Sequence, residues 1–142
     1  MSFFDQLGAL FAKYDVLGAF WVNIQLTFWA AIGSFVLGAI LALMRISPVP
    51  SLRWAGTIYV HLFRNTPLTI LMTLALLGVW TQFQLSFSTD FETNFFVYAV
   101  IVLSIYHASF VCEAIRSGVN TVPTGQAEAA RAIGLGFMDT AR

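Results

Sequence analysis

Three long stretches without a charged side chain constrain the fold of this chain more than any other feature. They run from Val16 to Met44, from Asn65 to Thr89 and from Thr93 to Cys112. Each is long enough for a transmembrane helix, which needs roughly 20 residues, and a backbone in lipid must satisfy its own hydrogen bonds. The sequence therefore predicts an all-α integral membrane protein with three transmembrane helices, at about 18–44, 66–86 and 94–114.

The composition supports lipid as the main solvent. Of the 142 residues, 58% are hydrophobic and only 10% are charged, whereas a soluble domain usually carries about 25% charged residues. The formal net charge is zero and no basic block is present, which argues against nucleic acid as a partner. The single cysteine, Cys112, has no second cysteine for an internal disulfide, and we expect it to be a buried small hydrophobe.

The positive charges predict the orientation of the chain in the membrane. Six of the seven Lys and Arg residues fall either between the first two predicted helices or after the third, namely Arg45, Arg53, Arg64, Arg116, Arg131 and Arg142. Three helices place these segments on one side, which the positive-inside rule assigns to the cytoplasm. The N-terminus and the loop at Asp90 are then expected outside the cell membrane.

No arrangement of residues in the sequence indicates catalysis. There is no Cys/His cluster with metal-ligand spacing, no nucleophile elbow and no phosphate-binding Gly-x-x-x-x-Gly-Lys loop. We therefore expect no enzyme, no catalytic residue, no metal and no cofactor. Any energy from ATP must come through a separate partner protein.

A short helix with small side chains is predicted in the region 122–136. Pro123 suits a helix start, helix-forming residues follow, and Gly134 suits a C-terminal stop in the left-handed conformation. The alanines leave a flat surface, and Glu128 and Arg131 can fix the register of a partner. This pattern favours a cytoplasmic docking helix over an ordinary surface helix.

Two polar segments border the second and third predicted spans. The first, Arg64–Thr69, contains Pro67, which suits either the first turn of a helix or a local break. Arg64 is then either a snorkelling anchor or part of a polar path. In the second segment, Glu113 and Arg116 are three residues apart and can pair on one helix face. His107 fits a packed or interface histidine better than a proton relay, because the first two spans contain no carboxylate.

These segments, in this order, resemble the permease subunits of polar amino-acid ABC importers, most closely the glutamate-type permeases of actinobacteria. The resemblance covers nearly the whole chain, and its most specific part is Glu-Ala-Ala, three residues, then Gly, which matches the family's cytoplasmic coupling loop. The matching segments are Arg64–Thr69, Glu113–Gly118 and Gly125–Arg131, followed by Gly134.

The resemblance implies residue roles and partners. It implies an ATPase-coupling set of Gly125, Glu128, Ala129, Ala130 and Gly134, and a translocation path bordered by Arg64, Asn65, Thr66 and Glu113. It also implies an ABC ATPase, a second permease subunit in a homo- or heterodimer, an extracytoplasmic solute-binding protein, membrane lipid and an amino-acid substrate. Glutamate, glutamine and other polar amino acids remain open as that substrate.

The sequence departs from the family pattern at its end. The family signature continues nine residues beyond the position of Gly134 to an Ile-x-Leu-Pro segment, which lies past Arg142. We therefore expect residues 1–142 to be the N-terminal part of a single transmembrane domain, and the sequence to be a fragment. Two other functions stay open: a non-transporting membrane scaffold that binds a cytoplasmic protein through the Ala-rich helix, and an ion channel.

The orientation can be tested by cysteine labelling in intact cells, after Cys112 has been replaced. We expect an impermeant thiol reagent to label a cysteine at Thr89, because the Asp90 loop is predicted outside, and not one at Ser51. Ready labelling of Ser51→Cys with none of Thr89→Cys would reverse the predicted topology.

Overall fold

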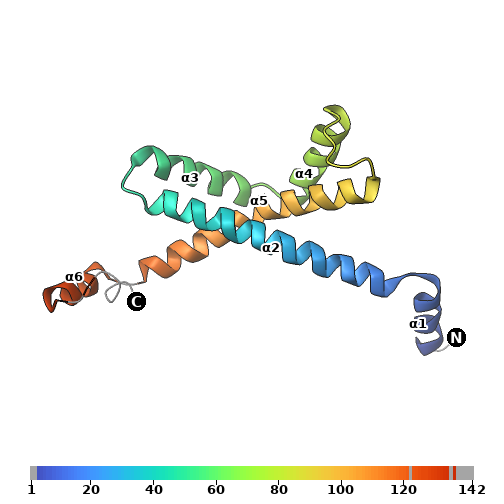
Figure 1. Ribbon diagram of the computed structural model, residues 1–142, viewed down its shortest axis with the longest axis horizontal. Coiled ribbons are helices and arrows are strands. Elements are labelled where there is room, and N and C mark those ends of the chain that lie inside the picture. Colours follow the sequence, from blue (N-terminus) through green and yellow to red (C-terminus); the bar gives the residue numbers. More distant parts are fainter. Residues whose placement is uncertain (1–2, 122, 135, 137–142) are drawn as a thin grey trace.

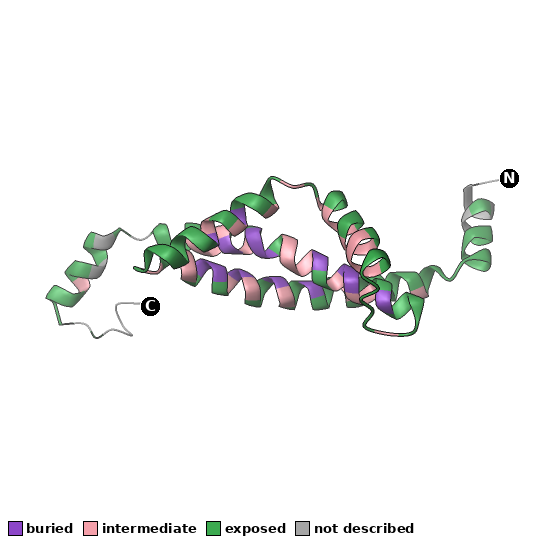
Figure 2. Ribbon diagram, turned by 90° about the horizontal axis from the view of Figure 1, so that it is seen from above, coloured by how far each residue is buried: buried purple, intermediate pink, exposed green. Residues whose placement is uncertain are grey.

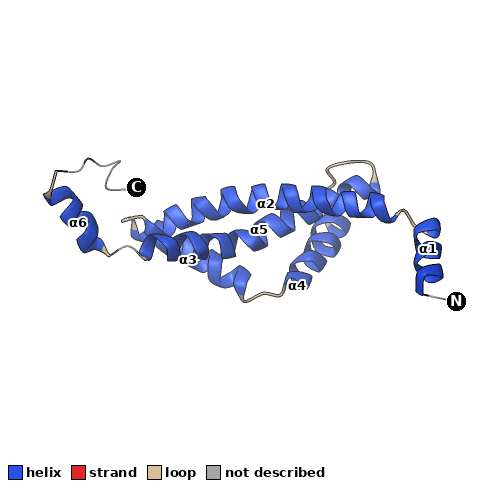
Figure 3. Cartoon of the chain, turned by 90° about the horizontal axis from the view of Figure 1, so that it is seen from below, coloured by secondary structure: helices blue, strands red, loops and turns tan. Residues whose placement is uncertain are grey.

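The computed structural model describes residues 3–121, 123–134 and 136, and the regular elements within them are all helices (Figure 3). The all-α class predicted from the sequence is confirmed for this part of the chain. In chain order the elements are α1 (Phe3–Lys13), α2 (Val16–Ile46), α3 (Pro50–Arg64), α4 (Leu68–Thr73), the π-helix η1 (Leu74–Gln82), α5 (Phe91–Asn120) and α6 (Thr124–Ala132).

Two of these helices are long and apolar enough to cross a membrane. They are α2, with 31 residues, and α5, with 30, and they contain the first and third predicted spans. Both run in the same direction along the elongated molecule, with α1 and α6 projecting at opposite ends (Figure 1).

The segment between them differs from the expectation of one span after a connecting loop. Residues 50–64 form the helix α3, which begins at Pro50 after the Ser47–Val49 turn and runs back along α2 (Figure 1). α3 and the helix Leu68–Gln82 are bent by 96° at a short break. The described residues therefore hold two candidate spans, or three if the bent pair is one span, and the count of three stays a prediction.

The close contact between α2 and α5 is made by small residues. On α2 the buried face repeats every fourth residue, at Ala30, Ser34, Gly38 and Ala42. A methyl group at Gly38 would lie 2.7 Å from Val111 Cβ and 2.9 Å from the Ala108 carbonyl oxygen. In lipid, helices associate through such close packing because the surrounding tails are as apolar as the side chains. The buried residues accordingly line the facing sides of the two helices (Figure 2).

α3 completes a small core beside this contact. Val60 of α3 packs with Leu41 and Ala42 of α2, and with Ala108 and Cys112 of α5. Cys112 is fully buried, as the sequence predicts for a small hydrophobe. The Tyr59 hydroxyl also donates to the Ile105 carbonyl oxygen over 2.8 Å, which fixes α3 beside the middle of α5.

The loop before α5 is held by side chains from the first turns of that helix. Asn94 Oδ1 accepts from the backbone N–H groups of Phe87 and Ser88 at 2.7 and 3.0 Å, and its Nδ2 donates to the Ser88 carbonyl oxygen at 2.7 Å. The Tyr98 hydroxyl donates to the Leu85 carbonyl oxygen at 2.7 Å. Asn94 and Tyr98 are both buried, so α5 supplies the hydrogen-bond partners that this turn of the loop needs.

Asp90 ends this loop as the N-cap of α5. The hydroxyl and the backbone N–H of Thr93 donate to Asp90 Oδ2 over 2.7 and 2.8 Å. These two bonds stabilise the ionised carboxylate and therefore lower the pKa of Asp90.

The helix contact predicts opposite effects for alanine at two glycines. Gly38→Ala should lower the thermal unfolding midpoint, because overpacking costs roughly 1–3 kcal/mol where backbone cannot give way. Gly118→Ala is the matched control. Its new methyl group would meet nothing within 4 Å. Alanine in a helix interior stabilises the fold by roughly 0.5–1 kcal/mol relative to glycine, so this variant should have a higher midpoint. Melting curves of the purified protein in detergent decide this, and a Gly38→Ala midpoint at or above wild type would contradict the packing argument.

Candidate functional site

The ends of three helices meet at one carboxylate. Arg45 Nη1, from the last turn of α2, donates to Glu113 Oε1 of α5 and forms an ion pair with it. Arg64 Nη1, at the end of α3, lies 3.9 Å from the same oxygen, and Arg116 Nε lies 3.4 Å from Glu113 Oε2. We call these four residues the Glu113 cluster. Each arginine attracts Glu113 more strongly near the apolar interior than it would in water, and the arginines repel one another more strongly for the same reason.

The three arginines differ in how firmly they are held. The side chain of Arg45 is only 9% exposed, whereas those of Arg64 and Arg116 are 46% and 41% exposed. Gly56 of α3 makes room for Arg45, since a methyl group there would lie 2.8 Å from Arg45 Cγ. Arg45 is therefore the fixed partner of Glu113, and the other two arginines are the accessible ones.

Arg64 stands at the break between two helices. It is the last residue of α3, and its guanidinium lies over the Phe110 ring at 5.5 Å from the centroid. Asn65 and Thr66 follow, and Pro67 precedes the first residue of α4. Pro67 thus lies in a break between α3 and α4, rather than in the first turn of a helix, which was the other role predicted for it. Charged groups and interrupted helices inside membrane proteins commonly mark a polar pathway.

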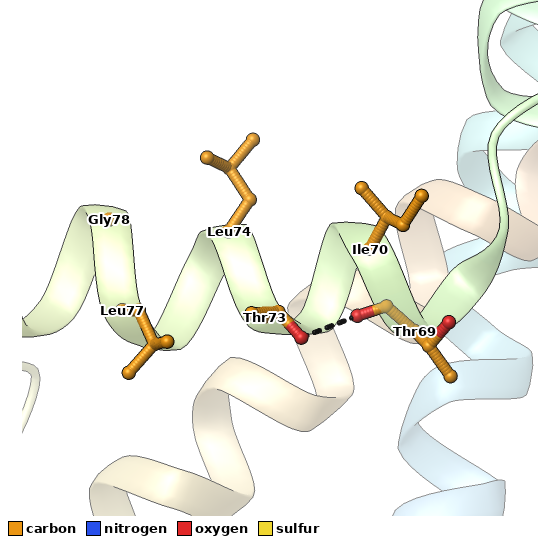
Figure 4. A pocket seen from close by; sticks show the side chains of 6 residues that line it. All are labelled: Thr69, Ile70, Thr73, Leu74, Leu77 and Gly78. Atoms are coloured by element: carbon orange, nitrogen blue, oxygen red, sulfur yellow. Dashed lines mark hydrogen bonds between the residues drawn. The ribbon is translucent and has the colours of Figure 1, made fainter.

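The helix after the break carries a shallow apolar groove (Figure 4). It has a volume of about 420 Å³ and is lined by Thr69, Ile70, Thr73, Leu74, Leu77 and Gly78. The Thr73 hydroxyl donates to the Thr69 carbonyl oxygen over 2.8 Å (Figure 4). From Leu74 onward the helix is a π-helix, a rare form that is frequent at functional sites.

A second groove, also of about 420 Å³, lies between α2 and α5. His107 and Phe110 of α5 line it together with the hydroxyl-bearing Thr27 and Ser34 of α2. His107 is exposed and contacts the rings of Tyr106 and Phe110. The Thr27 and Ser34 hydroxyls both donate to backbone carbonyl oxygens of their own helix, so toward the groove they can only accept hydrogen bonds.

α6 is the short helix predicted near the end of the chain. It begins after Pro123, which lies just before the first helical residue rather than within the first turn. It ends at Ala132, and Gly134 has φ +84°, which confirms the predicted left-handed stop. Glu128 and Ala129 are exposed, and Ala130 is partly so. Within the described residues, the helix thus offers an open surface of small side chains.

The structure brings some of the sequence-predicted residues together and keeps others apart. Arg64 and Glu113 approach each other, and the Glu113–Arg116 pair that their spacing allowed is present. The residues predicted to couple to an ATPase lie on α6 and just after it, at one end of the molecule and away from the break (Figure 1). The role of Arg45 was missed, because its partner lies 68 residues away in the sequence. The only signal was an arginine next to an otherwise uncharged stretch.

Comparison with known proteins finds a family model and relatives that match most of the chain. A family model described as the binding-protein-dependent transport system inner membrane component matches residues 11–142. The chain is 48% identical over 133 residues to the glutamate transport system permease protein GluC of Corynebacterium efficiens, covering 90% of this chain and 58% of that protein. It is 34% identical over 141 residues to the glutamate/aspartate import permease protein GltJ of Escherichia coli K12, covering 89% and 56%.

A solved structure shares the fold. It is described as the crystal structure of an amino acid ABC transporter with histidines, and it superposes with a TM-score of 0.68 at 30% identity. The match covers 83% of this chain and 52% of the other. The chain thus spans little more than half the length of these three proteins.

Proposed function

Since this chain belongs to the family of binding-protein-dependent transport system inner membrane components, we propose that it forms part of the permease subunit of an ATP-driven amino-acid importer. The observation that carries the proposal is the 48% identity over 133 residues with a glutamate transport permease. Glutamate is accordingly the first substrate to test. Residues 1–142 are the N-terminal part of the permease's transmembrane domain.

The proposed mechanism involves no covalent chemistry in this chain. Two permease subunits pair in the cell membrane, with the N-terminus of this chain outside, and an extracytoplasmic binding protein delivers the amino acid. ATPase subunits bind from the cytoplasm, and their closure moves the helices between inward-open and outward-open arrangements. Broken helices support such a motion, because a break lets two parts of one span move separately.

α6 is proposed as the helix that docks into the ATPase. Gly125, Ala129 and Ala130 supply a small-residue contact beside the charged Glu128, and Gly134 follows the helix in a conformation that glycine favours. Support comes from the exposure of this surface and from its distance from the packed α2–α5 contact (Figure 1). The short distance in sequence between the end of α5 at Asn120 and the start of α6 at Thr124 also supports a docking surface that follows a candidate span.

Arg64, Asn65, Thr66 and Glu113 are proposed to border the translocation path. The break at Pro67 supports this, because it interrupts the helix next to an exposed guanidinium. An arginine there can meet the carboxylate of an acidic amino acid, since the guanidinium donor pattern matches carboxylate geometry.

The function predicts ATP-dependent uptake by the complete importer. The full-length permease, its ATPase and its binding protein, reconstituted in vesicles, should accumulate labelled glutamate only when ATP is present on the ATPase side. Unlabelled aspartate and glutamine, added as competitors, define the substrate range. Vesicles that take up no amino acid under these conditions would contradict the proposed function, and ion conductance without nucleotide would favour a channel.

The docking role predicts steric intolerance on α6. Ala130→Trp should release the ATPase or uncouple ATP hydrolysis from uptake, because overpacking a contact costs roughly 1–3 kcal/mol. Gly134→Val should act in the same way, because a β-branched residue opposes the positive φ of this position. Gly8→Val in α1, at the other end of the molecule, is the control. Co-purification of the ATPase and uptake are measured together. Wild-type values for both the Ala130 and the Gly134 variant would show that this segment is not the docking helix.

A further inference from the structure

Within the described part of the chain, the Glu113 cluster holds more positive than negative side chains. Three guanidinium groups lie within 4.0 Å of one carboxylate, which cannot bind all of them equally well. Arg45 has the closest contact and is almost fully buried. Arg64 is half exposed, and its 3.9 Å separation from Glu113 Oε1 is too long for a hydrogen bond. The Arg45–Glu113 contact is thus tight, and the Arg64–Glu113 contact beside the helix break is loose.

The cluster lies where three segments of the chain meet. Arg45 belongs to the last turn of α2, and Arg64 is the residue at which α3 ends before the 96° bend. Glu113 lies about two turns before α5 ends at Asn120, and α6 begins soon after, at Thr124. A continuous helix therefore connects Glu113 to the segment that leads into α6.

We propose that Glu113 is a positioning residue that transmits displacement of α6 to the break at Arg64. Arg45 keeps α5 fixed to α2 through Glu113, and the loose Glu113–Arg64 contact tightens or opens as α2 and α5 shift together relative to α3. This inference rests on the proposed function, because it needs α6 to be moved by an ATPase. It adds a role for Glu113 and Arg64 that differs from contact with the transported molecule.

A coupling role and a substrate-contact role affect different measurements. Loss of a substrate contact raises the KM for the amino acid. Loss of coupling instead raises the number of ATP molecules hydrolysed per amino acid imported, even at saturating substrate. A residue that only stabilises the fold lowers uptake and ATP hydrolysis in proportion and leaves their ratio unchanged. The ratio therefore identifies the role.

The test uses the complete importer in vesicles, with uptake and ATP hydrolysis measured on the same sample. Glu113→Gln keeps the side-chain size but removes the charge that holds the arginines. Arg64→Gln removes only the loose, half-exposed partner, so it leaves no buried arginine unpaired and still reports if Glu113→Gln fails to fold. Both should raise the ATP cost per imported amino acid by about fivefold or more, the lower end for coupling between sites.

Two further variants sharpen the result. Arg64→Lys keeps the positive charge beside Glu113 and Phe110, and should restore the ratio toward wild type. Glu92→Gln, at the opposite end of α5, removes a carboxylate outside the cluster and should leave the ratio unchanged. If Glu113→Gln or Arg64→Gln folds and keeps the wild-type ratio, the positioning role is overturned. If the wild-type vesicles import no amino acid, it is the proposed function that fails.

Discussion

The close contact between α2 and α5 is the constraint on which the rest of this structure depends. In a membrane, apolar helices gain little by leaving lipid for each other, so the contact must come from backbones that approach closely. Gly38 and Ala42 on one helix and Ala108 on the other provide that approach. A larger residue at these positions would separate the helices, and α3 would lose the surface against which Val60 packs.

The same contact explains why a charged cluster can exist beside an apolar core. Because α2 and α5 run in the same direction, their corresponding ends bring Arg45 and Glu113 within reach of each other (Figure 1). A carboxylate with a nearby guanidinium avoids the cost of an unpaired charge in a poorly solvated place. Because three arginines surround one carboxylate, the positive charge of Arg64 is only partly neutralised beside the break between α3 and α4.

The sequence was sufficient for the parts of the fold that follow from local patterns. Uncharged stretches located α2 and α5, and Pro123 with Gly134 bounded α6 to within a residue or two. The sequence was insufficient where contacts between residues far apart in the chain determine the structure. The buried stripe of α2 passes through Ser34, Gly38 and Ala42, and the surface that it meets on α5 lies far away in the sequence. The sequence places Arg45 only in the segment between the first two predicted helices, and its pairing with Glu113 depends on tertiary contact alone.

The hydrogen-bonded loop before α5 has a practical consequence for anyone who modifies this protein. Asn94 and Tyr98 bind backbone groups at three of its residues, so an inserted epitope or fluorophore tag would have to break those bonds. The junction of α1 and α2, around Tyr14, is exposed and lies at the edge of the molecule (Figure 2). A reporter group inserted there would leave the helix packing intact.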